Sequence, residues 1–123
     1  MTAEEKYKAL IKYRSKHKLE KGHKHHVIPR CMNPPRNKCL ILTLQEHTLA
    51  HYWLMQWFKK VPKYKKYVDS MSSAFKGLRN QWIYSICRWR FKADEVYRRF
   101  EANYVKRFLT CPDEFVDCND FDI

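Results

Sequence analysis

The sequence lacks several features that mark common classes of protein. None of its five cysteines forms a CxxC pair, and their odd number leaves one thiol over, which argues against a disulfide-stapled secreted fold and against a Cys-rich zinc ribbon. No run approaches the roughly 18 apolar residues that span a bilayer, and the N-terminus has no apolar signal core. We therefore expect a protein that works in a reducing, cytoplasmic environment without a membrane partner.

Acidic residues are also scarce outside the end of the chain. The chain has 25 Lys and Arg against 13 Asp and Glu, a formal net charge of +12, and five of the acids lie within residues 113–123. Residues 1–112 hold all 25 basic residues and eight acids, so they carry +17. Such a surface attracts polyanions, of which nucleic acid is the commonest, although a membrane surface or an acidic protein would also satisfy the charge. The charge predicts a class of partner but no reaction.

The 123 residues leave room for a single domain, for which we expect an α+β fold that is mostly α. Apolar residues at helical spacing predict a basic amphipathic helix near the N-terminus and further helices after Pro62. The expected segments are a basic N-terminal helix (1–20), a hairpin–helix module (21–60), a helical region (61–110) and an acidic tail (111–123). Helices are expected over residues 3–19, 43–59, 64–79, 81–91 and 92–109.

The module at residues 21–60 has the order strand, loop, strand, helix. Short apolar or β-branched runs predict strands over residues 24–28 and 38–42, and the Pro-rich loop between them cannot be helical. Thr43 and Glu46 match the capping box, in which a hydroxyl and a carboxylate bind the first free N–H groups of a helix. We prefer this capping role for Glu46 over a catalytic one.

Four histidines and one asparagine gather in this module. His25, His26, Asn37, His47 and His51 fall within 27 residues of a chain that has six histidines. His47 and His51 are four residues apart, so a helix directs both imidazoles to one side. His25, at the end of the first strand, can supply a third ligand. Three imidazoles leave one position of a metal ion open for substrate, as catalytic sites require.

Neighbouring side chains of a strand point to opposite faces, so His26 is free for a role different from that of His25. Phosphodiester hydrolysis needs a base for the attacking water and a cation for the charge on phosphorus and on the leaving 3′ oxygen. An imidazole suits the base role at neutral pH. Asn37 both donates and accepts, so its amide can hold His26 or its backbone across the loop.

The alternative to a catalytic metal site is a structural zinc site closed by Cys31 or Cys39.

These residues resemble the HNH nuclease family. His26, Asn37 and His47 stand at the three positions that give the family its name. The phrase HHVIPRC, followed by NKCLILTLQEHTLAH, is most similar to the small phage-encoded HNH endonucleases, many of them homing enzymes. The resemblance covers about residues 20–57. It implies a ββα-metal fold that docks in the minor groove of double-stranded DNA and cuts it with one divalent ion.

The resemblance also implies individual roles, with His26 as the general base and Asn37 as the residue that orients the hairpin, although some HNH enzymes use the asparagine as a ligand. The implied metal ligands are His25, His47 and His51. The chain departs from the pattern where a Glu is often found two residues before the His pair, since His23 stands there. The ion is open among Zn, Mg, Mn and Ni, because three imidazoles favour zinc, nickel or cobalt whereas the family often works with magnesium or manganese.

Basic residues near the module offer contacts to nucleic acid. Arg30 and Arg36 flank the loop, where a guanidinium can grip a phosphate in a bidentate way, or where each can be a solvated charge. A run of lysines after the helix can follow a DNA backbone or form a solvated face. These lysines are Lys59, Lys60, Lys63, Lys65 and Lys66.

Taken together, the residues predict a metal-dependent DNA endonuclease of phage or mobile-element type, in the host-cell cytoplasm if it is phage-encoded. A monomer would nick DNA and a homodimer could cut both strands. One alternative is a nucleic-acid-binding protein that keeps the ββα module without catalysis, against which the intact base candidate His26 argues. Another is an RNase or toxin that uses the same site, which only substrate testing separates.

Overall fold

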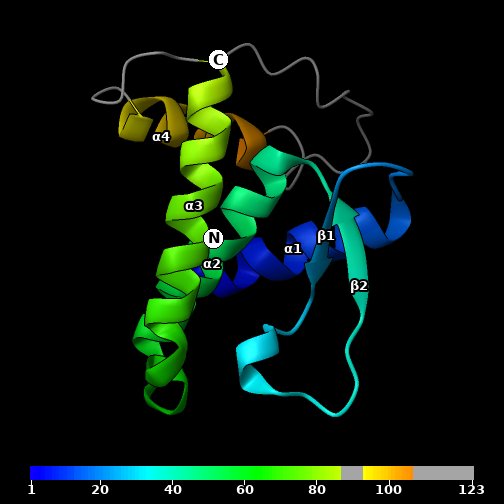
Figure 1. Ribbon diagram of the computed structural model, residues 1–123, viewed down its shortest axis with the longest axis vertical. Coiled ribbons are helices and arrows are strands. Elements are labelled where there is room, and N and C mark those ends of the chain that lie inside the picture. Colours follow the sequence, from blue (N-terminus) through cyan, green and yellow to red (C-terminus); the bar gives the residue numbers. More distant parts are fainter. Residues whose placement is uncertain (87–92, 107–123) are drawn as a thin grey trace.

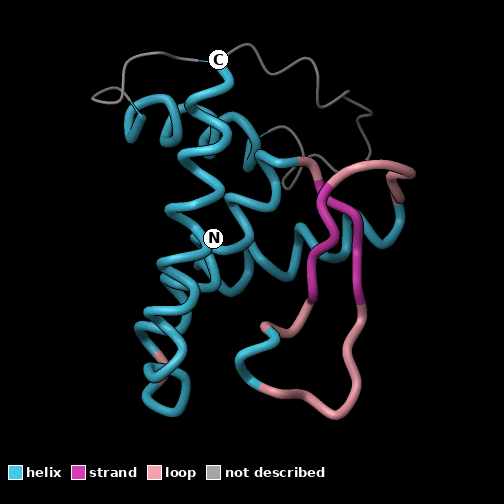
Figure 2. The backbone as a smooth tube through the Cα atoms, in the orientation of Figure 1, coloured by secondary structure: helices cyan, strands magenta, loops and turns pink. Residues whose placement is uncertain are grey.

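The computed structural model describes residues 1–86 and 93–106, which form mainly helices beside a two-stranded sheet (Figures 1 and 2). This confirms the expected α+β, mostly helical class. No helix within these two ranges combines the length and the apolar character that crossing a bilayer requires. The elements in chain order are α1 (Ala3–Lys16), β1 (His23–His26), η1 (Arg30–Met32), β2 (Cys39–Leu42), α2 (Leu44–Lys60), η2 (Pro62–Tyr67), α3 (Val68–Ile86) and α4 (Ala93–Tyr104).

Helix α1 begins at a capping box formed by Thr2 and Glu5. The Thr2 hydroxyl accepts from the Glu5 N–H at 3.2 Å, and the Thr2 N–H donates to the Glu5 carboxylate at 3.3 Å. The helix ends at Lys16, three residues before the expected end, and the Arg14 guanidinium then donates to the carbonyl of His17 at 3.1 Å. This bond satisfies a carbonyl that the helix leaves without an internal partner.

Strands β1 and β2 pair antiparallel, with His25 opposite Leu40 and His26 opposite Cys39. Both strands are shorter than expected, and β1 ends at His26 instead of Ile28. Gly22 precedes β1 with φ 152°, where an added Cβ would lie 2.5 Å from the Leu42 carbonyl oxygen. Only glycine accepts this combination of backbone angle and close approach without strain.

Helix α2 lies between α1 and α3 (Figure 1). Its apolar face forms the centre of the core. It begins after Thr43 and ends before Pro62, close to the expected bounds. The core side chains with 4% exposure or less are Tyr7, Leu10, Leu42, Leu49, Ala50, Trp53, Leu54, Phe58, Met71, Trp82, Phe100 and Tyr104.

The expected break between helices at residues 64–79 and 81–91 is wrong. A 3-10 segment occupies Pro62–Tyr67, and α3 then runs without interruption from Val68 to Ile86. Met71, Phe75 and Trp82 are all buried at helical spacing, so one continuous apolar face crosses the place of the expected break. The expected helix at 92–109 corresponds to α4, while Phe108 and the acidic segment 111–123 lie outside the described residues.

Candidate metal centre

The structure brings together His25, His47 and His51, the three predicted ligands. One ring nitrogen from each lies within 4.8 Å of the other two. His25 comes from β1, and the other two lie one turn apart on α2, with their Nε2 atoms 3.2 Å apart. The sheet and the first turns of α2 therefore hold three imidazoles at one point.

Burial keeps these imidazoles neutral. His25 is 2% exposed, and burial together with the neighbouring imidazoles of His51, His47 and His26 lowers its pKa to about 2. Burial also lowers the pKa of His47 to about 4, with smaller effects from His51 and His23. For His51, burial alone lowers the pKa to about 4. Each ring thus has a free lone pair at neutral pH, which is the form that binds a metal.

The donor set fits a divalent transition-metal ion. Zn–N bonds of roughly 2.0–2.1 Å in a tetrahedral site place neighbouring ligand nitrogens about 3.3 Å apart, close to the 3.2 Å between the Nε2 atoms of His47 and His51. The Nδ1 of His51 is buried and has no hydrogen-bond partner among the described residues.

The alternative of a zinc site closed by a cysteine receives no support from the arrangement. Cys31 and Cys39 are both exposed free thiols, and neither belongs to the ligand group of the described chain. A centre with three protein ligands keeps a coordination position for water or substrate.

His26, the predicted base, borders the same cleft as the three ligands. It is half-buried, and it does not belong to the ligand group. The cleft has a volume of about 400 Å³ and is lined by Lys24, His25, His26, Pro29, Arg30, Cys31, His47, His51, Ser70 and Met71. A substrate in the cleft would meet His26 and the three imidazoles together.

Asn37 clamps the loop that follows β1. Its Nδ2 donates to the Ile28 carbonyl at 2.6 Å, and its Oδ1 accepts from the Ile28 N–H at 3.0 Å. This pair extends the ladder one step beyond the bond from the Val27 N–H to the Lys38 carbonyl at 2.9 Å. Asn37 was expected to hold His26 or the backbone of His26, whereas its amide binds the backbone of Ile28, two residues further along the chain. The two bonds link the two sides of the hairpin loop.

Two residues beside the ligands were missed as functional residues. The Tyr7 hydroxyl of α1 lies 2.8 Å from the His25 Nε2, and the His23 Nδ1 lies 3.2 Å from the His47 Nδ1. For His23 the sequence held a signal, since strand alternation puts residues 23 and 25 on one face. For Tyr7 it held none, because this contact depends on where α1 packs.

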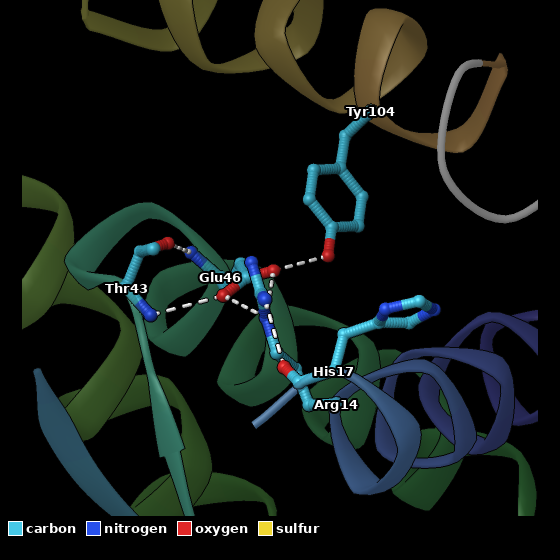
Figure 3. A network of polar contacts seen from close by, with 5 residues as sticks. All are labelled: Arg14, His17, Thr43, Glu46 and Tyr104. Carbon is cyan, nitrogen blue, oxygen red and sulfur yellow. Dashed lines mark hydrogen bonds and ion pairs between the residues drawn. The ribbon is translucent and has the colours of Figure 1, made fainter. Parts of the chain in front are cut away.

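Glu46 takes the expected capping role, and its carboxylate also accepts hydrogen bonds from two other helices (Figure 3). Its carboxylate accepts from the Thr43 N–H at 3.0 Å, from the Arg14 Nε at 2.9 Å and from the Tyr104 hydroxyl. Glu46 is fully buried and Arg14 is 4% exposed, and a buried charge of this kind requires such partners. The network joins α1 and α4 to the start of α2, one residue before His47.

The predicted DNA-binding residues divide into two groups. Arg30, at the start of η1, is exposed and lines the cleft. Arg36 and the five lysines are exposed but do not line it. The lysines occupy the end of α2 and η2, and the hairpin loop with η1 projects toward the same end of the long axis (Figure 1). The predicted lysines are Lys59, Lys60, Lys63, Lys65 and Lys66.

Comparison of the chain with protein-family models, with curated proteins and with solved structures finds no match. The residues of the cleft therefore carry the functional proposal.

Proposed function

We propose that this protein is a metal-dependent endonuclease that hydrolyses phosphodiester bonds of double-stranded DNA. His25, His47 and His51 are the metal ligands of this proposal, and His26 is the general base. The observation that carries it is the convergence of one buried and two half-buried imidazoles, neutral at pH 7, on a cleft that His26 also borders. A binding protein has no need for a fourth imidazole at that place.

The reaction assigns one task to each group. His26 takes a proton from a water molecule as its oxygen forms a bond to phosphorus, and the bond from phosphorus to the 3′ oxygen breaks. The products are a 5′ phosphate and a 3′ hydroxyl, whose proton comes from solvent. A divalent cation held by the three imidazoles would supply positive charge against the phosphorane oxygens and the leaving oxygen. Arg30, exposed at the cleft, holds a neighbouring phosphate.

For the fold we infer that β1, β2 and α2 form the ββα-metal module of the HNH nuclease family. Support comes from the order of the elements, from the capping box at Thr43 and Glu46, and from the loop clamp by Asn37. The exposed lysines at the end of α2 and in η2 extend the basic surface beyond the cleft, so they serve as backbone contacts outside the cleavage point.

The test is cleavage of supercoiled plasmid by the purified protein in EDTA, Mg²⁺, Mn²⁺, Zn²⁺ and Ni²⁺. We expect metal-dependent conversion to open-circle or linear DNA, which His26→Ala reduces by about 10²–10⁴-fold. His17→Ala is the matched control, because His17 is an exposed imidazole outside the cleft. A small diester such as bis(p-nitrophenyl) phosphate removes the need for a recognition sequence.

Three outcomes would contradict the proposal. Equal cleavage by wild type and His26→Ala would exclude His26 as the general base. DNA that is bound but not cut, with no diester hydrolysis in any metal, would favour a binding protein. Cleavage of RNA alone, in the same metals, would make the enzyme a ribonuclease.

A further inference from the structure

We propose that Tyr7 and His23 are positioning residues that determine which ring nitrogen His25 and His47 present to the metal. The inference rests on the metal centre of the proposed function and not on the reaction assigned to it. Tyr7 forms a hydrogen bond with the Nε2 of His25, and His23 forms one with the Nδ1 of His47. The resulting tautomers follow from counting protons.

For His25 the assignment follows from the single proton of a phenol. The Tyr7 hydroxyl lies 2.5 Å from the Val27 carbonyl oxygen and 2.8 Å from the His25 Nε2. A carbonyl only accepts, so the phenol proton is donated to Val27. Both contacts are then satisfied only when the Nε2 of His25 carries a proton and donates it to the phenol oxygen. The lone pair of neutral His25 is left on Nδ1, which becomes its ligand atom.

Burial and ring packing favour the same assignment. Tyr7 is 4% exposed, so solvent water does not compete for the bond from its hydroxyl to the Val27 carbonyl. Its ring also packs edge-on against the His25 ring, with centroids 5.9 Å apart. Tyr7 thus restrains both the tautomer and the orientation of the ligand.

For His47 the two nitrogens have different neighbours. Its Nε2 lies 3.2 Å from the Nε2 of His51, and its Nδ1 lies 3.2 Å from the Nδ1 of His23. When Nε2 binds the ion, the proton of the neutral ring must be on Nδ1, where it is donated to the lone pair of His23. His23 then carries its own proton on Nε2. Within the strand, residue 23 shares its face with residue 25, so β1 supplies both a ligand and a ligand's partner.

His51 provides the internal contrast. Its Nδ1 has no partner within the described ranges, so no hydrogen bond restrains its second nitrogen there. His25 and His47 thus each have a hydrogen bond at the nitrogen that does not bind the metal, whereas His51 has none among the described residues. Loss of an outer hydrogen-bond partner of a ligand typically lowers metal affinity by 10–100-fold. We expect an effect of that size for His25 and His47 only.

The test is the Zn²⁺ affinity of the full chain, measured without DNA by competition with a chromogenic chelator. Tyr7→Phe keeps the ring and removes the hydroxyl, and we expect it to weaken Zn²⁺ binding by about 10–100-fold. Tyr104→Phe is the matched control, since it removes a buried, hydrogen-bonded phenol hydroxyl that contacts Glu46 instead of a ligand. It should bind Zn²⁺ as wild type does. Wild-type affinity of Tyr7→Phe would overturn the role of Tyr7.

For His23 a conservative variant separates positioning from packing. His23→Ala removes the acceptor and should weaken Zn²⁺ binding by about 10-fold or more. The carbonyl oxygen of an asparagine branches from Cγ as Nδ1 does, so His23→Asn should restore most of the affinity. Equal affinities for the alanine variant, the asparagine variant and wild type would overturn the role of His23.

A spectroscopic measurement reports the tautomers directly. In the Zn²⁺-loaded wild type, long-range ¹H–¹⁵N correlation of histidine-labelled protein should show His25 bound through Nδ1 with a proton on Nε2. His47 should show the reverse pattern. The opposite assignment of either ring would overturn the inference even if both variants bind zinc weakly. Tight Zn²⁺ binding with these tautomers, but without DNA cleavage, would leave this inference standing and would reject the nuclease instead.

Discussion

Glu46 and His47 are neighbours in the chain, yet their side chains enter two polar clusters that differ in kind. The Glu46 carboxylate faces Thr43, Arg14 and Tyr104, so a buried negative charge is matched by a buried positive one and by further donors. The histidine cluster holds three neutral rings and a buried nitrogen without a partner in the described chain.

The difference indicates what each cluster is for. A cluster whose donors and acceptors match within the protein stabilises the fold by itself, and any deletion leaves a group unsatisfied. A cluster of close imidazoles, all kept neutral and with few donors among them, is better suited to a ligand from outside. The same turn of α2 therefore supports one cluster that anchors the helix, the anchoring cluster, and one whose ring nitrogens lie close enough together to bind a metal ion, the histidine cluster.

The largest effect expected of a single substitution is that of Glu46→Ala, which breaks the anchoring cluster. It leaves the Arg14 guanidinium buried without its carboxylate, and loss of one partner of a buried ion pair typically destabilises by about 3–5 kcal/mol. Urea unfolding followed by circular dichroism measures the change. A loss below about 1 kcal/mol would show that solvent reaches Arg14, and would remove the distinction between the clusters.

The second effect concerns the histidine cluster. Free Zn²⁺ at about 100 times its Kd should raise the free energy of unfolding by about 2.7 kcal/mol, because the folded state alone presents the three ligands together. His51→Ala should abolish most of this gain, and His17→Ala should leave it intact. Equal stabilisation of the two variants by Zn²⁺ would show that the ion binds outside the histidine cluster.

The third effect is acid destabilisation of the metal-free protein in EDTA. In the folded state the pKa values of His47 and His51 are lowered to about 4 and that of His25 to about 2, whereas an unfolded histidine titrates near 6.5. Between about pH 6.5 and 4 the unfolded chain binds more protons, so stability falls as the pH falls through this window. Each imidazole contributes up to about 1.4 kcal/mol per pH unit.

Urea unfolding at pH 7.5, 6 and 5 measures this slope, and a His47→Gln variant should flatten it, because the amide does not titrate. A slope that is the same in wild type and variant would contradict the neutral state of the cluster.

The smallest expected effect is that of Tyr104→Phe, which removes one of the donors to Glu46. The carboxylate keeps Arg14 and the helix cap, so we expect a loss of about 1–2 kcal/mol. Thermal unfolding measures it. A loss as large as that of Glu46→Ala would mean that the anchoring cluster depends on α4 more than on the ion pair.

Sequence spacing predicted the parts of the site that depend on local geometry. His47 and His51 are one helical turn apart, and Thr43 with Glu46 marks the helix start, so both follow from the chain near them. His25 was expected at the end of a short strand, and the strand ends one residue later.

The contacts that His25 and Glu46 make with residues of other helices do not follow from local spacing, because they depend on how distant helices pack. Tyr7 meets His25 across 18 positions, Arg14 meets Glu46 across 32, and Tyr104 meets Glu46 across 58. The break expected near residue 80 also failed for a tertiary reason, since burial of Trp82 extends the apolar face of α3 past it. Local spacing in the sequence therefore predicted the clustered histidines, whereas the residues that contact them from other helices depend on tertiary packing.

The 58 positions between Glu46 and Tyr104 separate two events during synthesis of the chain. A ribosome adds about 5–20 residues per second, so Tyr104 is made roughly 3–12 s after Glu46. Tyr7 and the three clustered histidines are made before Glu46 or within a few residues of it. Under the proposed function, the nascent chain would be able to bind a metal ion before α4 is made, and the bound ion would hold α2 in place until α4 packs against it.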